Sequence, residues 1–273
     1  MGGSVTSSPL AGQHVLVTRP AGQAEGFRAL LEAAGATVTT APTIRLVPPS
    51  EPGALGRAAA RLAEYDWIVP TSVNAVRRLA AAASEADSMG ALATGRLAAV
   101  GPATADALRG VGVAECLVPP AYRGEALADE IVAATDPESL PDSRILLVQA
   151  ERARPVLRER LIAAGARVDV APAYAVEVNR DVRGALRKFI ELGRGDWLTF
   201  TASSAARAFV QLVGAQTGGA LVAAISPVTA ATLSGLGLPV HVVAATHSMP
   251  GLVDALVASA ARPGRFAATH GHA

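Results

Sequence analysis

An internal repeat constrains the fold of this chain more than any other feature of its sequence. Dipeptides of the first half recur in the second half at a constant offset of 130 residues: Gly35-Ala36 as Gly165-Ala166, Ala41-Pro42 as Ala171-Pro172, and Asp66-Trp67 as Asp196-Trp197. Further along, residues 99–104 recur as residues 224–229, an offset of 125, so one connection is five residues shorter in the second copy. An internal repeat of this kind in a chain of 273 residues predicts two similar domains.

Each copy alternates short apolar runs with amphipathic stretches. In the first copy we expect strands at 15–17, 38–41, 67–69, 97–100 and 113–118, and helices at 23–34, 74–83 and 104–109. The second copy repeats this order. Alternating strands and helices are typical of a parallel sheet covered on both faces. The predicted architecture is α/β, with two flavodoxin- or Rossmann-like lobes facing each other across a cleft.

Composition excludes several classes of partner. Lys plus Arg total 24 and Asp plus Glu total 23, and aromatic residues make up 4% of the chain, so the sequence favours neither nucleic acid nor an anionic membrane as a ligand. Residues 208–253 carry no charged Asp, Glu, Lys or Arg, but glycines and prolines interrupt them, so no membrane span is predicted. With Cys116 as its single cysteine, the chain has no intrachain disulfide, and we expect an inert core thiol in a cytoplasmic protein.

Both chain ends are predicted to be flexible. Residues 1–13 contain no Lys, no Arg and no apolar run, so we interpret them as a flexible N-terminal segment rather than a secretion signal. Residues 263–273 contain His270 and His272, for which a flexible tail is a better interpretation than a metal site.

Candidate ligand-binding residues follow the predicted strands. In open α/β sheets ligands bind beyond the carboxyl ends of the strands. The residues at these ends are mostly hydroxyl, amide or small residues that open a helix: Thr18, Arg19, Thr71, Ser72, Asn74, Gly101, Thr104, Gln149, Thr201, Ser203, Ser204, Ser226, Pro227 and Thr229. Helix starts present free N–H groups and a positive dipole end, which suit anions.

The alternative is helix capping, because Ser, Thr and Asn are preferred N-caps and proline suits the first turn. Recurrence of these loops in both copies favours ligand binding. Asp66 and Asp196 precede their strands, so we expect them at the opposite edge of each sheet in a solvated or turn role.

No conventional catalytic motif stands out. The sequence has no HExxH, no P-loop, no GxSxG and no cluster with metal-ligand spacing, and we predict neither a metal nor a cofactor. The Gly-x-Gly segments at 110–112 and 235–237 follow helices and are interpreted as helix ends. Tyr174 is one of three tyrosines and lies where one copy passes into the other. A core tyrosine and a functional phenol both remain open at this point.

Several segments together resemble the uroporphyrinogen-III synthase family of tetrapyrrole biosynthesis over residues 15–257. They are HVLVTRP at 14–20, TSVNAV at 71–76, AAVGPATADAL at 98–108, Tyr174 after AAGARVDVAPA, and AAISPVTAATLSGLGLPV at 223–240. The resemblance implies one lobe formed by 14–42 plus 179–262, a second lobe at 49–172, and linker strands at 43–48 and 173–178.

The family's reaction converts hydroxymethylbilane, a linear tetrapyrrole with eight carboxylates, into cyclic uroporphyrinogen III with loss of water and inversion of the last ring. The resemblance implies that Tyr174 donates a proton to the leaving hydroxyl. It also implies substrate contacts at Thr104, Thr229, Ser72, Asn74 and Ser204. The resemblance further implies the upstream hydroxymethylbilane synthase as a partner, and a monomer is expected. The rival hypotheses are a two-lobe anion-binding protein and a non-catalytic sensor with the same fold.

Overall fold

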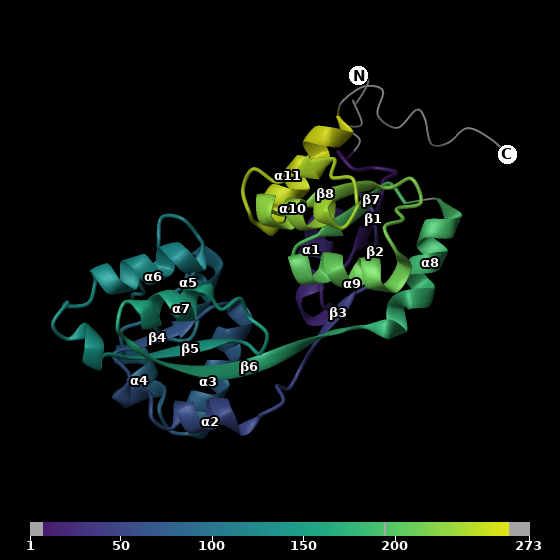
Figure 1. Cartoon of the computed structure of the whole chain (residues 1–273). Helices are drawn as coiled ribbons and strands as arrows, with labels where there is room; N and C mark the ends of the chain where they lie inside the picture. The colour runs from purple at the N-terminus through teal and green to yellow at the C-terminus, as the bar shows by residue number, and fades with distance from the viewer. Residues whose placement is uncertain (1–7, 194, 262–273) are drawn as a thin grey trace, which may run out of the picture. The chain divides into compact units, whose positions relative to one another are not determined.

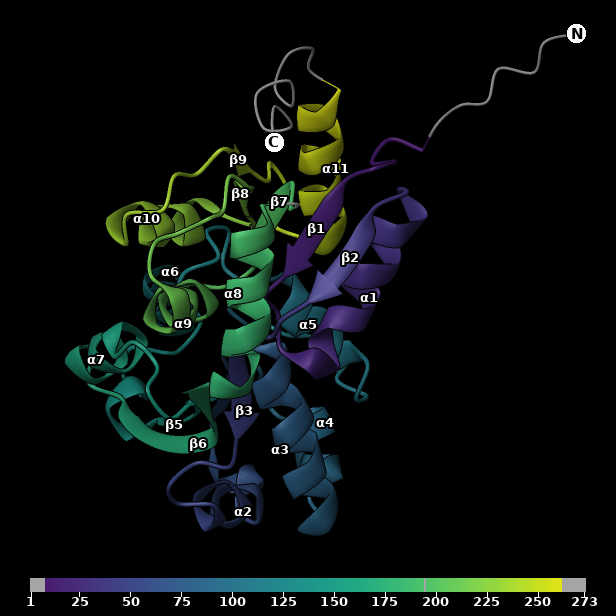
Figure 2. The same ribbon diagram turned by 90° about the vertical axis from the view of Figure 1, so that its right-hand side faces the viewer.

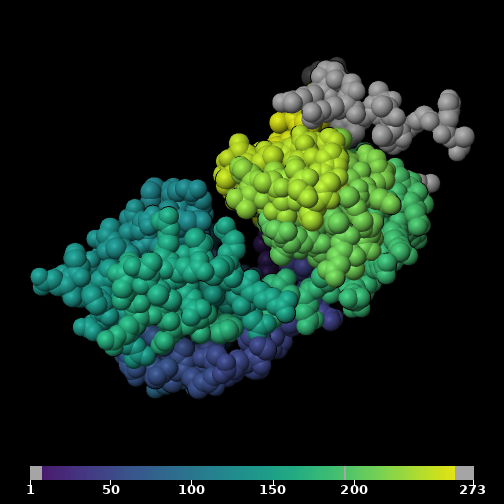
Figure 3. All heavy atoms as spheres, viewed as in Figure 1, coloured from purple at the N-terminus to yellow at the C-terminus, as the bar shows by residue number. Residues whose placement is uncertain are grey.

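The chain forms two compact units in a computed structural model that describes residues 8–193 and 195–261. Unit 1 comprises the chain up to Arg45 and from Glu177 onward, and unit 2 comprises Leu46–Val176. Figure 1 shows that purple and green-to-yellow segments, from the two ends of the chain, build unit 1, whereas the blue-to-teal middle builds unit 2. In the space-filling view the visible surface of unit 1 comes mainly from the C-terminal part of the chain (Figure 3).

Unit 1 contains a five-stranded sheet in the order β2-β1-β7-β8-β9. All neighbouring strands are parallel, as predicted. The strands are β1 (His14–Val17), β2 (Thr37–Thr40), β7 (Trp197–Phe200), β8 (Leu221–Ala224) and β9 (Val242–Val243).

Helices cover both faces of this sheet. One face carries α1 (Ala21–Ala33) and α11 (Met249–Ala260), and the other carries α8 (Arg183–Leu192), α9 (Ser203–Val213) and α10 (Pro227–Gly235) (Figure 2). Alternation along β1 explains this division, since Val15 and Val17 pack with Phe27 of α1 while Leu16 packs with Phe209 of α9.

A four-stranded sheet in the order β3-β6-β5-β4 lies mostly in unit 2, while the first two residues of β3 and the last two of β6 belong to unit 1. Its strands are β3 (Ile44–Val47), β4 (Trp67–Pro70), β5 (Arg144–Ala150) and β6 (Arg167–Val178), and the β4–β5 and β5–β6 pairs are parallel. Buried residues of α6 (Gly124–Ala133) and α7 (Val156–Ala163) pack on one face. The other face is covered by α2 (Gly53–Ala59), α3 (Val73–Glu85), α4 (Met89–Thr94) and α5 (Pro102–Arg109).

The predicted repeat is confirmed in the strand registers. In unit 1, Val15 pairs with Val38 on one side and Trp197 on the other; in unit 2, Ile145 pairs with Val168 and Trp67. Each sheet therefore joins strands of the first copy to strands of the second copy.

The two aspartates of the repeat make equivalent hydrogen bonds. Asp196 Oδ2 accepts from the His14 N–H at 2.7 Å, and Asp66 Oδ2 accepts from the Arg144 N–H at 2.8 Å. Each carboxylate thereby satisfies the first donor of a neighbouring strand. This is a structural role at the amino end of the sheet, as the sequence predicted.

Two predicted strands are shorter than expected. Segments 97–100 and 113–118 form only isolated parallel bridges, Ile68 with Leu97 and Ala98 with Leu117. Prolines that lack a ladder donor follow both segments, at 102 and at 119–120, which is consistent with such short pairing at a sheet edge. Cys116 therefore lies outside any strand, and the prediction of a core strand position was wrong. The thiol is half-buried, and burial raises its pKa.

The prediction that the N-terminal segment is flexible is wrong for residues 8–13. Leu10 is fully buried in unit 1, and its N–H donates to the Ala34 carbonyl at 2.8 Å. Gln13 accepts a hydrogen bond from the Trp197 indole. The predicted histidine-containing tail at 263–273 lies outside the described residues. In the described part of the chain, no helix is long and apolar enough to cross a membrane.

Candidate functional site

A pair of hydroxyl groups from distant parts of the sequence meets where strands β4 and β5 of unit 2 end. Ser72 follows β4 and is the N-cap of α3, where its Oγ accepts the Ala75 N–H at 3.1 Å. Tyr174 lies in β6 opposite Ala150, the last residue of β5. The Tyr174 hydroxyl lies 3.0 Å from Ser72 Oγ. Two residues predicted separately are therefore in hydrogen-bond contact.

The backbone around Tyr174 holds this pair in place. Its carbonyl accepts the Glu151 N–H at 2.8 Å, and its side chain is only 8% exposed and packs in the core beneath α3. The register between β5 and β6 shifts at Gln149 and Ala150, which brings Tyr174 rather than Ala173 opposite Ala150. A phenol held at the carboxyl end of a parallel sheet is well placed to reach a ligand bound there.

Gln149 is a buried polar side chain at the same end of the sheet. It is 8% exposed, and its amide makes no hydrogen bond to any other residue that the structure describes. Its amide atoms are not among the fully buried unpaired atoms of the described residues, so the amide retains its capacity for a ligand or a water molecule.

Helix starts complete the unit 2 loops. Gly101 caps α5 without a side-chain bond, and Thr104 lies buried in the first turn of that helix. Thr71 donates its N–H to the Val148 carbonyl, and Thr71 and Asn74 are both partly exposed.

Arg19 is the main positive group among the predicted residues of unit 1. Its Nε donates to the Gln23 carbonyl at 2.9 Å, Nη2 to Gln23 Oε1 at 3.2 Å, and Nη1 approaches Met249 Sδ at 3.4 Å. None of the carboxylates described by the structure pairs with it. Burial lowers its pKa. A partly desolvated guanidinium without a carboxylate partner favours binding of an external anion.

Several predicted hydroxyl groups of unit 1 make hydrogen bonds within the fold. Thr18 is buried, and its hydroxyl donates to the Thr199 carbonyl at 2.8 Å, so that proton already serves the fold. Ser226 caps α10 by accepting from the Thr229 N–H at 3.3 Å, and Thr229 is buried behind it. Ser203 shares a 2.8 Å hydrogen bond with Thr232.

The remaining predicted residues of unit 1 are Thr201, Ser204 and Pro227. Thr201 follows β7, Ser204 lies in the first turn of α9, and Pro227 opens α10. The capping alternative is thus confirmed for Ser72 and Ser226, and a capping hydroxyl can still contact a ligand.

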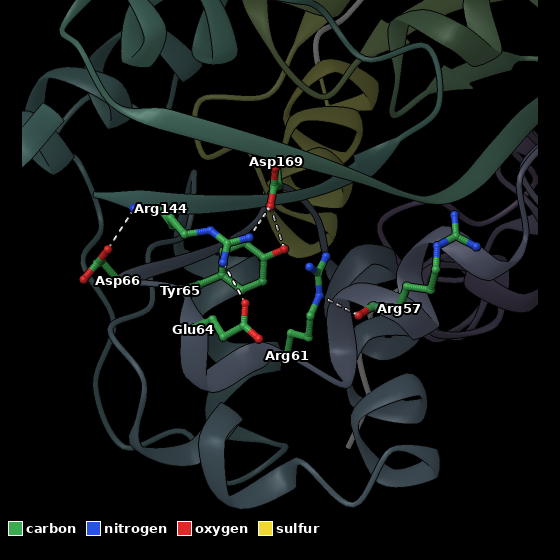
Figure 4. Close-up of polar contacts among 7 residues, drawn as sticks. All are labelled: Arg57, Arg61, Glu64, Tyr65, Asp66, Arg144 and Asp169. Carbon is green, nitrogen blue, oxygen red and sulfur yellow. Dashed lines mark hydrogen bonds and ion pairs between the residues drawn. The ribbon is translucent and has the colours of Figure 1, made fainter. Parts of the chain in front are cut away.

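A polar cluster at the opposite edge of unit 2 is one that the sequence analysis missed (Figure 4). Tyr65 donates to Asp169 Oδ2 at 2.9 Å, while Arg144 pairs with Asp169 at 3.1 Å and with Glu64 at 2.7 Å. The hydrogen bond from Tyr65 is the main reason that the pKa of Asp169 is lowered, and burial followed by that bond raises the pKa of Tyr65. Arg144 opens β5, so the cluster ties the amino ends of strands together and lies away from Tyr174.

Comparisons with known proteins agree on one family. A family model described as uroporphyrinogen-III synthase HemD matches residues 25–254. The uroporphyrinogen-III synthase of Synechococcus elongatus is 29% identical over 92% of this chain and 97% of its own length.

Two solved structures share the fold. A mutant uroporphyrinogen III synthase from the extremely thermophilic bacterium Thermus thermophilus has a TM-score of 0.64 at 23% identity, covering 91% of this chain and 98% of that one. The uroporphyrinogen-III synthetase of Helicobacter pylori has a TM-score of 0.59 at 17% identity, covering 90% and 99%. The family model carries the assignment, and it confirms the resemblance read from the sequence: the chain belongs to the uroporphyrinogen-III synthase HemD family.

Proposed function

We propose that this chain converts hydroxymethylbilane into uroporphyrinogen III, with loss of water and inversion of the last pyrrole ring. Membership of the uroporphyrinogen-III synthase family makes it an enzyme of tetrapyrrole biosynthesis. The observation that carries the proposed mechanism is the 3.0 Å contact between the hydroxyls of Tyr174 and Ser72.

The hydroxyl pair suits proton donation to a leaving group. Ser72 Oγ already accepts the Ala75 N–H, so its own proton can be donated to the Tyr174 oxygen. That arrangement leaves the phenol O–H free to point at the substrate. A phenolate that forms as the proton leaves is stabilised by the Ser72 hydroxyl and by the positive end of α3.

The substrate supplies most of the driving force. A pyrrole nitrogen lone pair expels the hydroxyl, which takes the phenol proton and leaves as water. An electrophilic azafulvene that is still protonated at nitrogen remains. The pyrrole at the far end of the chain attacks the electrophilic carbon through its own substituted ring carbon, which gives a spiro intermediate. This intermediate fragments, and the macrocycle then closes with the last pyrrole inverted. The proton released on aromatisation of the final ring restores the phenol. The protein then has to orient the two chain ends and exclude water.

The eight carboxylates of the substrate need partners, and we propose that groups at the strand ends supply some of them. Arg19 supplies a charge that no described carboxylate neutralises, and Gln149 supplies an amide without a hydrogen bond to the described residues. The starts of α5 and α10 supply backbone N–H groups. In this proposal the two units are lobes joined by linker strands at 43–48 and 173–178, and their strand-end loops share one substrate molecule. Monomeric state, cytoplasmic location, operation without a cofactor and an encounter with hydroxymethylbilane synthase remain predictions.

The isomer formed from hydroxymethylbilane tests this proposal. Freshly generated substrate is incubated with the full chain, the products are oxidised, and uroporphyrins III and I are separated, with a protein-free incubation as control. We expect isomer III in excess of the control. A protein that binds uroporphyrin III but yields only the spontaneously formed isomer I would instead be a non-catalytic anion-binding member of the fold.

A further inference from the structure

The loop that follows the last edge segment of the unit 2 sheet carries an exposed aromatic ring beside a predicted substrate loop. Tyr122 is 55% exposed, and its hydroxyl makes no hydrogen bond to other residues in the described ranges. A Cβ placed on Gly101 would lie 3.4 Å from both Cβ and Cγ of Tyr122. The tyrosine is thus held directly against the N-cap of α5.

Two exposed arginines lie on this loop and on the next one. Arg123 follows Tyr122 and is the N-cap of α6, and Arg154 lies in the loop between β5 and α7. The two loops are neighbours, because a Cβ on Gly124, the first residue of α6, would lie 3.4 Å from Leu157 Cβ in α7. Both arginine side chains are exposed, and neither pairs with a carboxylate that the structure describes.

From this arrangement we infer that Tyr122, Arg123 and Arg154 form a subsite for one pyrrole ring of the substrate. The inference rests on the proposed function. The face of Tyr122 would lie against the pyrrole, and the two guanidinium groups would hold its two carboxylate arms. Tyr122 is then a positioning residue, since it takes no part in proton transfer.

The repeat makes this subsite specific to one end of the substrate. At the 125-residue offset the counterparts of Tyr122 and Arg123 are His247 and Ser248, and Ser248 is the N-cap of α11. Unit 1 therefore has a smaller ring in place of Tyr122 and a serine in place of Arg123, and its arginine near this helix start, Arg19, comes from the β1–α1 loop instead. A linear tetrapyrrole whose two ends must be distinguished before one ring is inverted needs such an asymmetry.

The test measures binding and turnover with the full chain. Affinity for uroporphyrin III is followed by porphyrin fluorescence, and KM and kcat are measured with hydroxymethylbilane, for Tyr122→Ala, Tyr122→Phe and Arg123→Gln. Ile162→Ala serves as a matched control, because Ile162 is 46% exposed on α7 in the same unit.

For Tyr122→Ala we expect Kd and KM to rise about 2- to 13-fold with kcat nearly unchanged, the range that corresponds to one aromatic contact. Tyr122→Phe and Ile162→Ala should behave as the wild type, and the loss in Arg123→Gln should shrink as salt is added. Unchanged Kd in Tyr122→Ala, or a Phe variant as weak as the Ala variant, would overturn the inference. A wild type that forms no isomer III would instead refute the proposed function, while the uroporphyrin arm still reports on Tyr122.

Discussion

Replacing Tyr174 by phenylalanine removes the phenol proton and little else. The ring is 8% exposed in the core of unit 2, and Phe preserves its volume and its contacts. The only interaction of that side chain lost within the described residues is the 3.0 Å hydrogen bond to Ser72. One such bond contributes about 0.5–1.5 kcal/mol to the free energy of unfolding, so we expect the variant to fold with a thermal midpoint only a few degrees lower.

The effect on turnover should be much larger than the effect on stability. General-acid assistance contributes roughly 10²- to 10⁴-fold. Because the pyrrole nitrogen itself expels the hydroxyl, we expect the lower end for Tyr174→Phe, a fall in kcat of roughly 10²-fold or less, or up to about 2.7 kcal/mol in the barrier. KM should change little, since the carboxylate partners are intact.

Tyr65→Phe is the matched control for this experiment. Tyr65 is also a buried tyrosine of unit 2 with one hydrogen bond, to Asp169, but it lies at the opposite edge of the sheet. Initial rates of isomer III formation are compared for both variants, with circular dichroism and thermal melting as checks on folding. Full activity in Tyr174→Phe, or equal losses in the two variants, would refute the assignment of Tyr174 as the proton donor.

Three further predictions concern charge, hydroxyls and pH. Arg19→Gln should weaken uroporphyrin III binding about tenfold or more, the loss typical of a charge-assisted hydrogen bond, and unchanged fluorescence titrations would contradict that. Thr104→Val and Thr229→Val should each raise KM for hydroxymethylbilane, whereas unchanged values in both would leave only structural roles for these residues. The lowered pKa of Asp169 means that its stabilising contribution is present above the ordinary value near 4 and is lost as pH falls through the lower folded value. Urea unfolding should therefore show the gap between wild type and Tyr65→Phe narrowing below about pH 4, and a gap that widens would be inconsistent with this sign.

The repeated strands were predictable because their signal is local. Three-residue apolar runs at 15–17 and 145–147, each followed by a helix that ends at a glycine, required no knowledge of tertiary contacts. Gly35 and Gly165 both adopt left-handed φ values, 94° and 104°, immediately after α1 and α7. The edge segments failed because strand length depends on what pairs with them, and an apolar run such as 113–118 does not specify its partner.

The site was predictable by position and not by contact. The rule that ligands bind at carboxyl ends selected Ser72, yet its pairing with Tyr174 depends on a register shift between β5 and β6 that no sequence pattern reports. Likewise, the sequence could not distinguish Thr18, whose hydroxyl is committed to the fold, from a hydroxyl available to a ligand. The same rule could have selected Tyr122, because this residue lies in the loop after the predicted strand at 113–118.

A crystal structure of the full chain with uroporphyrinogen III bound tests the central claim most directly. We predict that the ligand's carboxylates contact strand-end residues of both units, including Arg19 and the starts of α5 and α10, and that the Tyr174 hydroxyl faces the tetrapyrrole. A ligand bound at the amino ends of the strands, near Asp66 or Asp196, would contradict the account.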